Sequence, residues 1–245
     1  MKTLIKTVAL AVIALSCSKP ESFVTVRFGV GVPCGAVTRA MPDGLSDALS
    51  ATAPSGPFTL SLQSLENSLR TYSATTGVPL SVAVGSYSVT GSGSGRSVAQ
   101  ASNGAVYSSP SWSLSSEVTV RGDGEFSLPA SWTCFALVFD LSETDGVSVD
   151  GERISSLPGT DGWAVLYARP DAGKNWYVRA PLSVTVHPKD AVLGEAVSYD
   201  IITTTPQEGF VAVQNGYWYK LSPGRVEVVS GSMGVSFPEW MEGSY

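Results

Sequence analysis

Short runs in which apolar and polar residues alternate recur along most of this chain. In residues 23–30, Val24, Val26 and Phe28 share one face of an extended strand, and the residues between them are mostly polar. Residues 182–186 repeat the alternation. A period of two is typical of half-buried β-strands, so the pattern predicts a chain built mainly from strands.

Pairs of Asn or Asp with Gly separate many of these runs, and such pairs favour turns with positive φ. The clearest pair, Asn215-Gly216, joins two runs rich in β-formers, 209–214 and 217–221, which predicts a hairpin. Further strands are expected at residues 58–65, 80–84, 87–90, 117–120, 125–128, 133–141, 162–168, 176–178, 196–202 and 225–229.

Residues 62–72 are ambiguous, because Leu62, Leu65, Leu69 and Tyr72 also have helical spacing. The alternation that precedes Leu62 favours a strand, and a strand is the prediction.

Composition supports an all-β fold. Only 15% of the 245 residues are charged, and 25 are glycine, which suits many strands and turns better than a helical bundle. The length fits one large domain or two of about 100–125 residues. The most plausible boundary lies at 140–150, where a polar turn follows the apolar run 135–141.

The N-terminus has the features of a targeting segment. Residues 1–16 combine Lys2 and Lys6 with a short apolar run, as secretory signal peptides do. The run ends at a segment that resembles a bacterial lipobox, which predicts lipidation of Cys17 and a polar tether over residues 17–21. The alternative is an ordinary signal peptide beside an incidental cysteine. Removing residues 1–16 deletes two lysines and no acid, so the charge changes from -6 to -8.

Acylation of Cys17 would leave Cys34 and Cys134 in an oxidising compartment. They are candidates for a disulfide, and two separate buried thiols are the alternative.

The sequence offers little catalytic or metal-binding chemistry. The single histidine, His187, follows a predicted strand, so a Ser-His-Asp triad would depend on it alone. Neither a GxSxG segment nor a phosphate-binding glycine loop is present. The acidic residues of the stretch 140–152 lack the calcium-loop register. The negative charge argues against nucleic acid as a partner. We expect no enzyme activity, no cofactor and no metal.

Tyr217, Trp218 and Tyr219 are the candidate ligand-binding aromatics, because exposed rings on a β-sandwich stack on sugars. Period-two geometry places Trp218 on the face opposite both tyrosines. The alternative is that these rings belong to the core.

Four segments together resemble the fimbrillin-like surface lipoproteins of Bacteroides-type bacteria, the superfamily of pilus subunits and their anchors. They are the lipobox at Cys17, the strand run 22–30 with residues 37–40, the segment 78–90, and the C-terminal segments 219–224 and 237–240. The resemblance implies two tandem Greek-key, transthyretin-like β-sandwich domains. We assign them to residues 22–143 and 144–245.

In pilins of that superfamily an Arg-specific protease removes the N-terminal strand, and a strand from a neighbouring subunit replaces it. The resemblance makes Arg39 and Ala40 a candidate processing site, with an ordinary loop arginine as the alternative. Anchor-type members keep their lipid and remain uncleaved.

These observations predict a lipid-anchored, non-enzymatic protein of the outer membrane, exposed at the cell surface, with a structural or adhesive role as a pilus component or anchor. Its expected partners are the membrane, through the lipid, and other pilus subunits, through strand exchange. The alternative function is a surface glycan-binding lipoprotein of a polysaccharide uptake system, which would bind host or dietary glycans.

Overall fold

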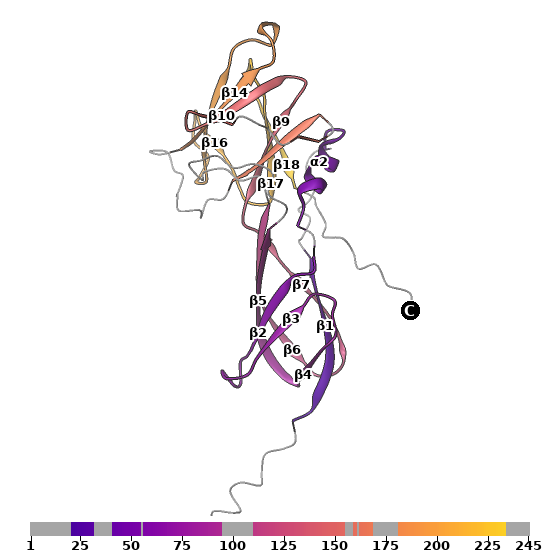
Figure 1. Ribbon diagram of the computed structural model, residues 1–245. Coiled ribbons are helices and arrows are strands. Elements are labelled where there is room, and N and C mark those ends of the chain that lie inside the picture. Colours follow the sequence, from indigo (N-terminus) through magenta and orange to yellow (C-terminus); the bar gives the residue numbers. More distant parts are fainter. Residues whose placement is uncertain are drawn as a thin grey trace, which may run out of the picture.

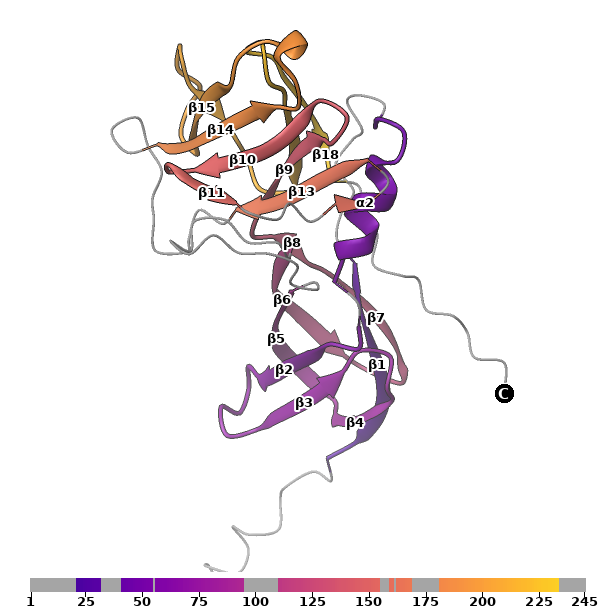
Figure 2. The ribbon, with the colours of Figure 1, turned by 45° about the horizontal axis from the view of Figure 1, so that its top comes forward.

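The structure is a computed structural model that describes residues 21–31, 41–54, 56–94, 110–154, 159–160, 162–168 and 181–233. Strands dominate these ranges, and each of two units consists of facing sheets around an apolar core. The units stand end to end in Figures 1 and 2. The predicted all-β sandwich fold is confirmed.

The N-terminal unit pairs a sheet of order β4-β1-β7 with one of order β3-β2-β5-β6-β8. Residues that alternate along the strands fill the space between them, as in β2, where every second side chain is buried. The bounds are β1 (Phe23–Gly31), β2 (Thr59–Ser64), β3 (Thr71–Thr75), β4 (Leu80–Ala83), β5 (Gly85–Ser94), β6 (Ser111–Val120), β7 (Gly124–Pro129) and β8 (Ser131–Trp132).

The C-terminal unit pairs a sheet of order β11-β10-β14-β15-β16 with one of order β12-β13-β9-β17-β18. Its strands are β9 (Phe135–Asp140), β10 (Thr144–Val149), β11 (Glu152–Ile154), β12 (Gly159–Thr160), β13 (Trp163–Ala168), β14 (Leu182–Pro188), β15 (Val197–Ile202), β16 (Val211–Ala212), β17 (Tyr217–Leu221) and β18 (Val228–Ser232). A short 3-10 helix, η1 (Ala191–Leu193), precedes β15.

Strand β9 is apolar on both faces because both faces are covered. Phe135, Leu137 and Phe139 belong to the core between the two sheets. Ala136 and Val138 point to the opposite face, where a second buried cluster lies under a helix. Near-continuous apolar sequence is typical of a strand that is covered on both sides.

That helix, α2 (Leu45–Thr52), was not expected from the sequence. Its buried residues Leu45, Ala48 and Leu49 follow the i, i+3, i+4 spacing of an apolar helix face and pack on the C-terminal unit. The Trp163 indole N–H donates to the Asp43 carbonyl just before the helix, at 2.9 Å. In Figures 1 and 2, α2 lies beside the upper unit, although the chain returns from it to β2 in the lower unit.

The hairpin predicted around Asn215-Gly216 is wrong. Strand β16 pairs in parallel with β15, whereas β17 pairs with β18 and, in parallel, with β9. The turn therefore connects two facing sheets. Gly216 has φ 83°, as the Asn-Gly signal anticipates, but pairing with distant strands decides which sheet each run joins.

Residues 62–72 form no helix. Strand β2 ends at Ser64 and β3 begins at Thr71, so the stretch is a strand, a turn and a strand rather than one continuous strand. Leu65 and Leu69 lie in the turn and are exposed.

The boundary expected between residues 143 and 144 stays a prediction. Strand β9 lies before that point and pairs with β13 and β17 of the C-terminal unit. Trp132, just ahead of β9, packs against the clusters of both units. Within the residues that the structure describes, no helix is long and apolar enough to span a membrane.

Candidate functional site

Strand β1 is the first element that the structure describes, and it is held by two different neighbours. Its first half, Phe23 to Val26, pairs antiparallel with β4. Its second half, Val26 to Gly31, pairs in parallel with β7. Strand β1 therefore lies in the middle of its sheet, and without it the facing edges of β4 and β7 would lose their hydrogen-bond partners.

The inward face of β1 is part of the N-terminal core. Val26 and Phe28 are fully or almost fully buried, and the Phe28 ring stacks on Phe126 with centroids 5.5 Å apart. Val24 and Val30 pack at the margin of the same cluster. The strand thus places two side chains, two residues apart, in the core. A strand that is added to a sheet from another chain is recognised in the same way, by sites for alternate side chains.

The outward face of β1 contributes little binding energy. The Arg27 side chain forms an exposed ion pair with Glu125 at 3.3 Å. Exposed pairs of this kind are weak, because water and salt screen them. The attachment of β1 rests on its main-chain hydrogen bonds and its buried side chains.

Arg39 and Ala40 lie outside the described residues, but the chain on either side of them is described. Before them, β1 belongs to the N-terminal unit. After them, Met41 packs against the cluster that holds α2 on the C-terminal unit. A cut after Arg39 would therefore separate β1 from the rest of the chain while leaving α2 attached.

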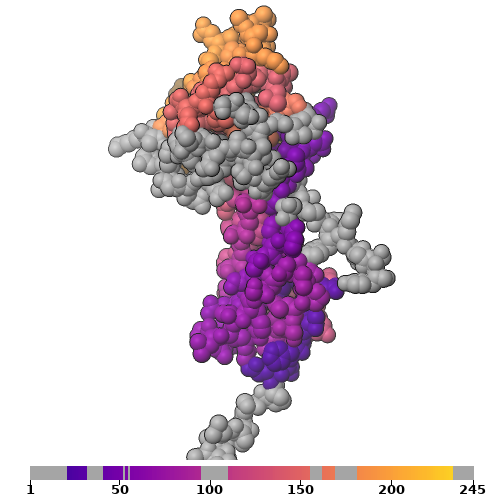
Figure 3. Space-filling model, viewed as in Figure 1, coloured from indigo at the N-terminus to yellow at the C-terminus, as the bar shows by residue number. Residues whose placement is uncertain are grey.

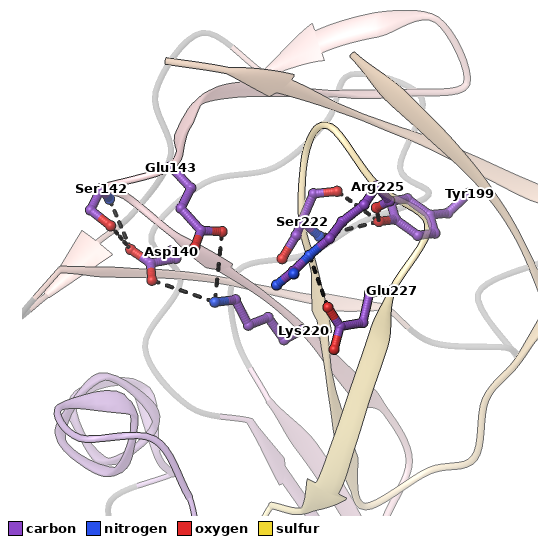
Figure 4. Close-up of polar contacts among 8 residues, drawn as sticks. All are labelled: Asp140, Ser142, Glu143, Tyr199, Lys220, Ser222, Arg225 and Glu227. Atoms are coloured by element: carbon purple, nitrogen blue, oxygen red, sulfur yellow. Dashed lines mark hydrogen bonds and ion pairs between the residues drawn. The ribbon is translucent and has the colours of Figure 1, made fainter. Parts of the chain in front are cut away.

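A polar cluster on the C-terminal unit surrounds Lys220 of β17 (Figure 4). The Lys220 ammonium lies 3.5 Å from the Asp140 carboxylate and 3.7 Å from that of Glu143. It also lies 5.2 Å from the centre of the Trp163 ring. These contacts tie the β9–β10 turn to β17.

Asp140 is kept ionised by its neighbours. Burial acts to raise the pKa of Asp140, but hydrogen bonds from the Ser142 hydroxyl and N–H, and the charge of Lys220, outweigh it. The pKa of this carboxyl is therefore lower than usual. A carboxylate held in its charged form beside a lysine is suited to fixing a turn, not to accepting or donating protons near neutral pH.

Tyr199 stabilises the loop after β17. Its hydroxyl lies 2.7 Å from the Ser222 carbonyl and 2.9 Å from that of Arg225, and it accepts from the Ser222 N–H. Arg225 also pairs with Glu227 at 2.8 Å, as Figure 4 shows. Burial raises the pKa of the Tyr199 phenol.

Of the three candidate ligand-binding aromatics, Trp218 and Tyr219 lie in the core and Tyr217 lies at its margin. Trp218 is 1% exposed and packs under α2, whereas Tyr219 is 7% exposed and belongs to the core between the sheets. Tyr217 is half-buried against that same core. The opposite orientation of Trp218 and the tyrosines is as predicted, but both faces are covered, so burial contradicts a stacking role for Trp218 and Tyr219.

The remaining candidates are scattered. Cys17 and Cys34 lie outside the described residues, so neither lipidation nor the disulfide is tested. Cys134 is buried, and its sulfur accepts from the Ser111 N–H at 3.3 Å. His187 bonds through Nε2 to the Ser148 hydroxyl at 2.8 Å. In the described part of the chain, no group of His, Cys, Asp or Glu side chains could hold a metal ion.

Comparison with known proteins gives structural likeness alone. No family model and no curated protein matches the chain. Among solved structures, the chain is similar to a candidate cell adhesion protein from Bacteroides eggerthii, with 10% identity, a TM-score of 0.47, and 86% of this chain and 96% of that one covered.

It is also similar to the tip fimbrial protein Mfa3 from Porphyromonas gingivalis, with 9% identity, a TM-score of 0.41, and 85% and 98% covered. A third neighbour is a candidate polysaccharide-binding protein from Bacteroides thetaiotaomicron, with 8% identity, a TM-score of 0.36, and 91% and 100% covered. TM-scores below 0.5 do not assign a function to this chain.

Proposed function

We propose that this chain is a lipid-anchored structural or adhesive protein of the cell surface, acting as a fimbrillin-like pilus component or anchor. The lipid would be attached at Cys17, and the N-terminal unit would join neighbouring subunits through the site that β1 occupies. The observation that carries the proposal is the position of β1: a strand near the start of the chain completes the middle of a sheet.

The bonding of β1 supports such a role. Strand β1 is held in the sheet by main-chain hydrogen bonds to β4 and β7 and by the burial of Val26 and Phe28. A strand from another subunit with apolar residues at the same spacing could make the same contacts. A replacing strand would therefore need the same alternation of apolar and polar residues that residues 23–30 of this chain show.

Strand exchange in solution tests this proposal. A specific protease site is placed at residues 36–41, the protein is cut, and a fluorescent peptide of residues 22–31 is added. We expect the peptide to replace β1 and to co-migrate with the folded protein. A cut protein that keeps its own β1 and takes up no peptide, or that unfolds without binding it, would contradict an exchangeable strand.

A matched peptide controls for non-specific binding. Val26→Asp and Phe28→Asp in the peptide place charges in the core, where an unpaired charge is strongly disfavoured. The same peptide with Thr25→Lys carries a charge only on the exposed face, where the neighbouring side chain, Asp123, is acidic. We expect binding of the Thr25 variant and none of the doubly substituted peptide.

The alternative function, glycan binding, required two or three coplanar exposed aromatic rings, and among the described residues Phe23 is the one large aromatic side chain that is exposed. Trp112, Trp163 and Trp218 are each at most 7% exposed, and Trp132 is half-buried between the units. Burial of these rings counts against the alternative within the described residues. A glycan array probed with the whole protein tests it directly.

A further inference from the structure

At one end of the N-terminal unit, the residues that lead into β1 lie beside three connections between strands. The Val84 N–H donates to the Ser22 carbonyl at 2.9 Å, which places the β4–β5 connection against the entry to β1. Arg70, in the β2–β3 turn, forms an ion pair with Glu21. Gly85 pairs with Val120, so the β6–β7 connection starts at the same level. We call residues 21–23, 65–70, 84–85 and 121–123 the entry pole.

The entry pole carries large apolar side chains that are exposed. Phe23 is 59% exposed and Leu69, at the tip of its turn, is 92% exposed. Of the eight exposed large apolar side chains among the described residues, four lie at this pole: Phe23, Leu65, Leu69 and Val84. In Figure 3 the indigo and purple segments that form this end lie far from the orange end of the C-terminal unit.

The charges of the entry pole nearly cancel. Arg70 and Arg121 stand against Glu21, Glu66 and Asp123, two cations against three anions, which leaves -1. Such a surface has no electrostatic attraction to anionic lipid. Any contact with a membrane would be made by its apolar side chains.

The sequence brings this pole close to a membrane. Glu21 follows Cys17 by four residue steps, and a fully extended chain spans at most about 3.6 Å per step, or about 14 Å in all. If acyl chains on Cys17 lie in the bilayer, the entry pole cannot move farther than this tether allows. The tether would therefore keep the exposed apolar side chains of the entry pole at a high local concentration of lipid.

We infer that the entry pole rests on the lipid surface, with Leu69, Leu65 and Phe23 inserted among the headgroups, so that the anchored molecule stands upright with its C-terminal unit pointing away. This inference rests on the lipid anchor of the proposed function. Apolar side chains of surface-bound proteins enter the headgroup and acyl boundary by about 5–10 Å, which side chains at the tip of a turn can reach.

The test measures how well water-borne acrylamide quenches a fluorophore at the pole. The full chain is expressed with its own leader in the Cys34→Ser background, carrying Leu69→Cys or, as a matched control, Val192→Cys. Val192 is 93% exposed in η1 of the other unit, so the two probes start from equal exposure. Acylation of Cys17 is read by intact mass, and the labelled protein is then placed in phosphatidylcholine vesicles.

With Cys17 acylated, we expect quenching at position 69 to be several-fold lower in vesicles than in a soluble Cys17→Ser version of the same variant, while quenching at position 192 is the same in both. The same fall should appear in high salt and with phosphatidylglycerol added, because the contact is apolar. Equal quenching in both states at position 69, or shielding of both positions, overturns the upright contact and leaves the anchor standing. A chain without acyl groups at Cys17 overturns the anchor and this inference with it.

Discussion

Two glycines among the described residues lie directly across a strand pair from a tryptophan. Gly93 pairs with Trp112 in the N-terminal unit, and Gly231 pairs with Trp218 in the C-terminal unit. A Cβ on Gly231 would come within 2.8 Å of the Trp218 ring, and one on Gly93 within 2.7 Å of the Trp112 indole nitrogen. Each large ring therefore lies over a position where no side chain stands.

Gly231→Ala tests this close packing. The added methyl group must displace the Trp218 ring, and overpacking of a well-filled core costs about 1–3 kcal/mol. We expect a lower free energy of unfolding in urea. Gly124→Ala in β7 is the matched control, because nothing lies within 4 Å of its new Cβ. A Gly231 variant as stable as the control would show that the ring can move freely.

Asp140→Asn tests the polar cluster. Asp140 has a lowered pKa in the folded protein, so its contribution to stability is fully present above its unfolded pKa of about 3.9 and is lost as the pH falls through the lower folded value. We expect the variant to be about 0.5–1 kcal/mol less stable at pH 7, and the difference to shrink below pH 4.

Urea unfolding of both proteins across this pH range gives the comparison, with the exposed Glu117→Gln as control. A difference that is the same at pH 7 and at low pH would show that the charge of Asp140 contributes nothing.

Among the elements, the strands were the most predictable and α2 the least. Alternation located β1, β2 and β14 because each buries one face and exposes the other. The helix has eight residues and begins after Gly44 without a side-chain cap, so it carries no strong start signal. The spacing of Leu45, Ala48 and Leu49 fits an apolar helix face, but three apolar residues are too few to distinguish a helix from other structures.

Long-range pairing decided what local signals could not. Asn215-Gly216 marked a turn correctly, yet β17 pairs in parallel with β9, which lies about eighty residues earlier. The candidate site was predicted in part: the run 23–30 is β1, but its position between β4 and β7 depends on two pairings that sequence spacing does not reveal.

Leu49→Ala tests the role of α2. The change removes a fully buried side chain, and such truncations cost about 2–5 kcal/mol. We expect faster hydrogen exchange in peptides from β13, against which the helix packs, and unchanged exchange in β2 and β5. Ser46→Ala, on the exposed side of the helix, is the control. Equal acceleration in both units would contradict attachment of α2 to the C-terminal unit alone.

At the scale of the whole molecule, the chain joins two sandwiches more than once. It leaves β1 in the N-terminal unit, packs α2 on the C-terminal unit, and returns to β2. The connection between β1 and β2 of the N-terminal unit is therefore held on the C-terminal unit through α2. Trp132 contacts the clusters of both units.

The proposed function requires that a lipid on Cys17 hold this molecule at a membrane. Mass spectrometry of the N-terminus, on protein isolated from the cells that produce it, tests this lipid attachment. We expect a chain that begins at acylated Cys17, whereas a chain that begins at Ala40 would lack the lipid and would identify a processed pilus subunit in place of an anchored protein. An unmodified N-terminus between residues 16 and 22 would contradict the account.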